Sequence, residues 1–117
     1  MRSGGMSVLT GWLKLKWAPV LLALVSVLAL AEQTVEVRIE KYAFTPQAVS
    51  IRVGDSVTWV NREKRTSHSI ILPIAGVSES ERLFPDERWT YRFEQPGRYD
   101  YHCGPHPEMK GLVVVSE

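Results

Sequence analysis

Three side chains that bind transition metals stand close together near the end of the chain. Cys103, the only cysteine, is followed by His106 and then by Met109, in the spacing Cys-x2-His-x2-Met. A thiolate, an imidazole and a thioether are the ligands that suit copper. A second imidazole, for which His68 is the natural candidate, would complete a His2Cys set with a weak axial methionine. Such a set is typical of blue-copper centres, which transfer single electrons.

Other chemistry with these residues has weaker support. Zinc also binds cysteine and histidine, but a thioether is a poor zinc ligand, so Met109 favours copper. A zinc hydrolase would need a general base, and Glu108 is close, but its neighbours give no further support. Cys103 could act as a nucleophile with a histidine, although a thiolate between His106 and Met109 is better placed to bind metal. Each residue alone also has an ordinary role, as a buried hydrophobe, a solvated side chain or a core filler.

Strand alternation should place the cysteine inside a β-domain. In a predicted strand over residues 98–103, Tyr99, Tyr101 and Cys103 share one face, and His102 points to the other. The two tyrosines indicate that their face is the core. His102 is therefore interpreted as a surface residue and not as a ligand, although it adjoins the cysteine. The loop that follows contains two prolines, each of which fixes its own φ and stiffens the ligand loop.

The chain from residue 32 onward has β character throughout. Alternating or short apolar runs, separated by turn residues, predict seven strands. These cover residues 34–39, 48–53, 56–60, 69–72, 88–93, 98–103 and 111–115. Gly54-Asp55 predicts a turn that joins the second and third of these strands as a hairpin. Short strands with turns at short spacing predict an all-β sandwich in a single domain, residues 32–117.

The first 31 residues differ from the rest. They hold three basic residues and no acidic one, and an apolar run from Trp17 ends in Ala29-Leu30-Ala31. A basic start, an apolar middle and a small-residue cleavage site are the layout of a secretory signal peptide. The apolar run of about 15 residues is short for a membrane span, which needs roughly 20. We therefore expect residues 1–31 to be a signal peptide, with an uncleaved anchor as the alternative.

Charge and cysteine usage limit the possible functions of residues 32–117. This segment has 11 basic and 13 acidic residues, and no basic cluster suggests a nucleic-acid surface. One cysteine cannot form an internal disulfide. In an exported protein a lone cysteine is a free thiol, an intermolecular bridge or a site ligand. The histidine and methionine beside it favour the ligand.

These motifs resemble the cupredoxin family of small type 1 blue-copper proteins, and most of all its amicyanin branch. The matching positions are 44–46, 53–55, 57–63, His68, 99–103, 105–107, Met109, Gly111 and 113–115. The two-residue gap between the loop histidine and the methionine is shorter than is typical of plastocyanins and pseudoazurins. The resemblance implies a Greek-key β-sandwich of about seven or eight strands with copper at one end. It also implies that His68, Cys103, His106 and Met109 are the ligands, and that electrons pass through His106.

The sequence departs from the family pattern beside the ligands. The family commonly has Asn directly after the first ligand histidine, tied to a Ser or Thr directly after the cysteine. Here these positions are Ser69 and Gly104, and because Gly104 has no side chain we expect a weaker tie. The surface near the exposed histidine is also more polar, since Glu108 replaces a bulky apolar residue and Lys64 and Arg65 precede the first ligand. The amicyanin partner, methylamine dehydrogenase, is therefore not carried over.

Together these features predict a periplasmic electron carrier with one type 1 copper per chain. Expected partners are redox proteins such as a dehydrogenase, a reductase or a c-type cytochrome, and Lys64 and Arg65 could steer an acidic one. We expect a monomer that binds no nucleic acid and, once the signal peptide is removed, no membrane. A copper carrier or buffer would use the same four ligands and is the alternative. A copper enzyme is not expected, because oxidases need more copper sites and three histidines cannot supply a second cluster.

Overall fold

Alternating apolar and polar side chains form strands with one buried face. A computed structural model describes residue 19 and residues 31–117 of the chain. In the first strand, Val37 and Ile39 are fully buried while Arg38 between them is exposed. The strands are β1 (Thr34–Glu40), β2 (Ala43–Thr45), β3 (Ala48–Arg52), β4 (Ser56–Asn61), β5 (Arg88–Arg92), β6 (Gly97–His102) and β7 (Lys110–Ser116).

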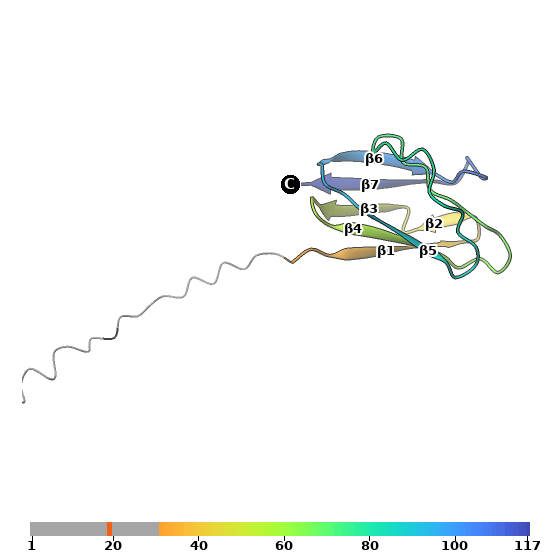
Figure 1. Ribbon diagram of the computed structural model, residues 1–117, viewed down its shortest axis with the longest axis horizontal. Coiled ribbons are helices and arrows are strands. Elements are labelled where there is room, and N and C mark those ends of the chain that lie inside the picture. Colours follow the sequence, from red (N-terminus) through yellow and green to blue (C-terminus); the bar gives the residue numbers. More distant parts are fainter. Residues whose placement is uncertain (1–18, 20–30) are drawn as a thin grey trace, which may run out of the picture. The chain divides into compact units, whose positions relative to one another are not determined.

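These strands form two sheets, in the orders β2-β1-β4-β5 and β3-β7-β6 (Figure 1). β1 and β4 are parallel, as are β3 and β7, and the remaining neighbours are antiparallel. Side chains from both sheets meet in one core cluster. The predicted all-β sandwich is therefore confirmed.

The predicted hairpin between residues 48–53 and 56–60 is wrong. β3 and β4 belong to different sheets, and Gly54 and Asp55 carry the chain from one sheet to the other. Gly54 has φ of 96°, in the left-handed region that favours glycine. β4 has five consecutive buried residues: Val57 and Trp59 face the core, and Thr58 and Val60 on the other face of the strand are buried as well. A turn signal alone does not say whether the next strand joins the same sheet.

The predicted strand over residues 69–72 is also wrong. This segment makes only isolated bridges, from Ile71 to His102 and from Leu72 to Val77. Its apolar character has another cause, since Ile70 and Leu72 are fully buried in the core. The strand that the sequence did not predict is β2, whose three residues are too few to show a clear alternation.

Tyr101 anchors the end of β6 that leads into the ligand loop. Its ring lies edge-on to Phe44 and Trp59, with centroid distances of 4.8 and 5.2 Å. Tyr101 is paired with Gly111 across β6 and β7, and a Cβ at Gly111 would overlap the tyrosine ring. Glycine at this position therefore lets the ring lie against β7. The packing fixes the direction of β6 two residues before Cys103.

The predicted signal peptide lies almost wholly outside the described residues, so residues 1–31 stay a prediction. Among the residues that the structure describes, no helix is long and apolar enough to cross a membrane. Ala31–Glu117 form one compact unit.

Asp55 connects the turn between the sheets to the start of β1. Its Oδ1 accepts the N–H of Gln33 at 2.8 Å, and its Oδ2 accepts the N–H of Arg52 at 3.0 Å. These two backbone donors stabilise the charged form and hold the pKa of the Asp55 carboxyl below its ordinary value. The ionised side chain is thus part of the fold.

We predict that Asp55→Asn lowers the melting temperature at neutral pH, because the amide oxygen cannot replace both carboxylate oxygens as acceptors. A carboxyl with a lowered folded-state pKa stabilises the fold above its unfolded pKa of about 3.9. That contribution disappears as the pH falls through the folded-state pKa. Thermal unfolding should therefore show a difference between wild type and variant that is constant near neutral pH and shrinks in acid. An undiminished difference in acid would contradict this role.

Candidate metal centre

Cys103 lies directly after β6 and is fully buried, as strand alternation predicts. Backbone hydrogen bonds close the loop that follows it. The N–H of Cys103 donates to the carbonyl of Met109 at 3.0 Å, and the N–H of Met109 donates to the carbonyl of His106 at 2.9 Å. Met109 is 3% exposed and belongs to the same core cluster as Cys103. The loop therefore folds back so that Met109 lies beside Cys103.

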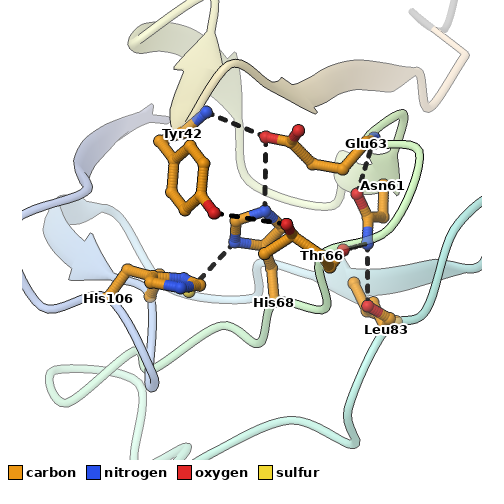
Figure 2. Close-up of polar contacts among 8 residues, drawn as sticks. Tyr42, Asn61, Glu63, Thr66, His68, Leu83 and His106 are labelled. Atoms are coloured by element: carbon orange, nitrogen blue, oxygen red, sulfur yellow. Dashed lines mark hydrogen bonds and ion pairs between the residues drawn. The ribbon is translucent and has the colours of Figure 1, made fainter.

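His68 is delivered to the same place by a long-range network. Its backbone N–H and carbonyl exchange hydrogen bonds with Leu83, at 3.0 and 2.7 Å. The buried amide of Asn61, at the end of β4, donates to the carbonyls of Thr66 (2.8 Å) and Leu83 (2.9 Å) (Figure 2). Its Oδ1 accepts the N–H of Glu63 at 2.9 Å. One buried side chain thus fixes both ends of the loop that precedes the histidine.

The donor atoms of His68, Cys103 and His106 lie within 4.8 Å of one another. Cys103 Sγ is 3.4 Å from His68 Nδ1 and 3.6 Å from His106 Nδ1. Ligand bonds of about 2 Å at about 120° would separate neighbouring donors by about 3.5 Å, which matches the two sulfur–nitrogen distances. The chemistry of the donor set, two imidazoles and a thiolate with a thioether nearby, fits copper.

Burial controls the protonation of the two inner donors. It lowers the pKa of His68, and repulsion from His106 acts in the same direction. The imidazole is therefore neutral at neutral pH and can offer a lone pair. Burial raises the pKa of the Cys103 thiol, although backbone N–H groups of Ser69 and His106 oppose this. A metal that binds here must displace the thiol proton, so metal affinity rises with pH.

The outer nitrogen of His68 faces Glu63. Its Nε2 is fully shielded from solvent and makes no hydrogen bond within the described part of the chain, and the carboxylate oxygen Oε1 of Glu63 lies 3.5 Å away (Figure 2). The same oxygen accepts the backbone N–H of Tyr42 at 2.8 Å. A carboxylate on the outer nitrogen of a ligating histidine favours the tautomer that exposes the other nitrogen to metal. The position of the Glu63 carboxylate therefore favours the His68 tautomer in which Nδ1 is free to face a metal.

Tyr42 covers the edge of the two imidazoles. Its ring lies edge-on to His106 and His68, with centroid distances of 5.0 and 5.9 Å. Lys41 and Tyr42 have φ of 55° and 56°, which is costly for residues with a side chain. Hydrogen bonds of the Tyr42 N–H to Glu63 and of its hydroxyl to Thr66 hold this conformation. The tyrosine is 52% exposed, so it forms part of the surface beside His106.

The structure brings together three of the four predicted ligands in one donor cluster and buries the fourth, Met109, in the same core. His102 lies outside the cluster, as its strand position predicts. Sequence reasoning left the partner of the His68 ring unnamed and gave no role to Tyr42. Glu63 carried a signal that could have been used, because it is the only acidic residue between β4 and His68.

Comparison with known proteins gives concordant matches. The family model of the cupredoxin-like domain matches residues 6–115. Amicyanin from Paracoccus denitrificans is 34% identical over 90 residues, covering 74% of this chain and 68% of that protein. Amicyanin-alpha from Methylorubrum extorquens is 39% identical over 84 residues, covering 69% of this chain and 71% of that protein. The crystal structure of amicyanin from Paracoccus versutus superposes with a TM-score of 0.66 at 36% identity, over 71% of this chain and 81% of that one.

We predict that Glu63→Gln weakens copper binding roughly tenfold, the usual cost of losing an outer partner of a ligand. The amide can still accept the Tyr42 N–H, so the loop should keep its conformation while the charge beside His68 is lost. Competition with a copper chelator measures the affinity. Glu40→Gln is the matched control, because Glu40 lies nearby and pairs with Arg38. Equal affinities for the two variants would show that Glu63 does not support the ring.

Proposed function

This chain belongs to the cupredoxin-like family as a blue-copper electron carrier, and from that premise we propose that it shuttles single electrons between redox proteins of the periplasm. In this proposal His68, Cys103, His106 and Met109 hold one copper ion. The observation that carries the assignment is the cluster of two imidazole nitrogens and one sulfur within 4.8 Å. We also propose that residues 1–31 direct export, on the strength of their signal-peptide layout.

The protein's part in transfer is to hold the donors still and to expose one of them. Copper, when bound, supplies the one-electron couple between Cu(II) and Cu(I). His68 and Cys103 are fully buried, which keeps water from the inner side of the site. His106 is partly exposed beside Tyr42, so its ring edge is the shortest way from the donors to the surface. Little motion of the donors is needed when the charge changes, which favours fast exchange with a partner.

We predict that metal-free protein titrated with Cu(II) develops an intense visible band and a type 1 electron-spin spectrum. Both depend on the copper–thiolate bond, so Cys103→Ser should abolish the colour. Met109→Gln is the comparison: it should retain coloured copper but shift the reduction potential, because the axial ligand tunes it. A Cys103→Ser protein that stays blue, or a Met109→Gln protein with an unchanged potential, would contradict the ligand assignment. Rapid release of copper to an acceptor with no electron exchange would favour a copper carrier.

A basic groove beside the site suggests the charge of the partner. It has a volume of about 470 Å³ and is lined by Glu40, Lys41, Arg62, Glu63, Lys64, Arg65 and Thr66. Glu40 and Arg62 are paired, with Arg38 and Asp86, and Glu63 faces the neutral His68 ring. Lys64 and Arg65 are exposed. We therefore propose that they steer a redox partner with an acidic surface.

We predict that Lys64→Glu slows electron transfer to hexacyanoferrate(III), an anionic probe, several-fold at low salt. The remaining rate should depend less on ionic strength, because rim charges act on the encounter rate. Arg98→Glu is the control, since Arg98 is exposed at the start of β6, at the far end of the strand from Cys103. Equal slowing by both variants, or rates independent of salt, would exclude steering by this groove.

A further inference from the structure

A carboxylate lies against the backbone of the residue that follows the ligand cysteine. A Cβ at Gly104 would overlap both Glu79 Oε2 and Ser69 Oγ, so these two oxygens occupy the space where a side chain would be. The N–H of Gly104 donates to Ser69 Oγ at 3.2 Å. The hydroxyl of Ser69 in turn donates to Glu79 Oε2 at 2.6 Å, the short distance of a hydrogen bond to a charged acceptor.

Ser69 stands between the two ligand segments and is completely buried. It follows the ligand His68 directly in the chain. Its hydroxyl holds Gly104, the next residue after the cysteine. A hydroxyl rotates freely unless both its donor and acceptor capacities are used. Here the Ser69 hydroxyl donates a hydrogen bond to Glu79 and accepts one from the N–H of Gly104, so the rotation of the hydroxyl is fixed.

The segment that bears Glu79 is itself held in place. The N–H of Ser80 donates to the carbonyl of Ile70 at 2.8 Å, and Ser80 Oγ accepts the N–H of Ile70 at 2.9 Å. These two bonds fix the chain next to Glu79 against the chain next to Ser69. The backbone on both sides of the contact is therefore held together, while the exposed Glu79 side chain gives up rotamer freedom to reach Ser69.

We propose that Glu79 is a positioning residue for the metal centre, acting through Ser69 on Gly104 and Cys103. This inference rests on the proposed function, in which Cys103 and His68 are copper ligands. The relay Glu79–Ser69–Gly104 ties the two ligand segments together without any side chain at residue 104. The sequence predicted a weak link between the residues that follow His68 and Cys103. In the structure this link includes a hydrogen bond to a carboxylate, Glu79, from a third part of the chain. Its negative charge also favours the higher oxidation state of the bound metal.

Two substitutions separate the hydrogen bond from the charge. Glu79→Ala removes both, so the Gly104 amide should lose protection from hydrogen exchange in metal-free and in copper(I) protein. Copper affinity should fall roughly tenfold. Glu79→Gln keeps an acceptor for Ser69 but loses the charge, so protection of Gly104 should persist while the reduction potential rises. The electron-spin spectrum of Glu79→Ala should also change, a signature that a purely structural role would not move.

The matched control is the same pair of changes at Glu81, an exposed carboxylate two residues further along the segment. Glu81→Ala and Glu81→Gln should leave Gly104 exchange, potential and spectrum as in wild type. If the Glu79 variants match the Glu81 variants in all three, the proposal is overturned. Thermal unfolding of metal-free protein checks that the Glu79→Ala variant is folded. If that variant is unfolded, Glu79→Gln alone still tests the effect of the charge on the reduction potential. A wild-type protein without blue colour would overturn the proposed function instead, while the metal-free exchange comparison would still decide the relay.

Discussion

A thiol and an imidazole buried side by side are the constraint on which the rest of this structure depends. Cys103 and His68 are fully shielded from solvent, with Sγ and Nδ1 3.4 Å apart. Buried polar atoms cost free energy unless partners satisfy them. A metal ion satisfies the sulfur and both imidazoles at once, so folding and metal binding are coupled. The donors are held in place without metal by three polar side chains that are buried or nearly so, those of Asn61, Glu63 and Ser69.

The ligand loop could be predicted from the sequence because its information is local. Cys103, His106 and Met109 lie within one short segment, and the period of a single strand decides which way the sulfur points. His68 was accessible by elimination, since only three histidines are present and His102 lies on the wrong face. The alternation that identifies strands also sufficed for the all-β class. In each case neighbouring residues carry the signal.

Strand partners and the outer contacts of the site could not be predicted in this way. Residues 48–53 and 56–60 have the same pattern whether they pair as a hairpin or lie in opposite sheets. Only the observed pairing, of β3 with β7 and of β4 with β1 and β5, decides between them. Glu79 comes from the irregular stretch 73–87, which has no periodicity to read. Its role depends on which segments the finished fold brings together. The departure at Gly104 could be seen in the sequence, but the carboxylate that replaces the missing side chain could not.

The two imidazoles differ in exposure, and this difference relates the packing to the function. His68 is buried behind Asn61 and Glu63, whereas His106 is partly exposed beside Tyr42. Electron tunnelling weakens steeply with distance, so a partner gains most by docking where a ligand reaches the surface. That surface has to tolerate contact with other proteins, while the donors behind it have to keep their positions. The positions of the donors are therefore best fixed by contacts on the buried side of the site. The hydrogen bonds of Asn61 and Ser69 are such contacts. The loop that carries His106 can then face a partner without having to stabilise the site alone.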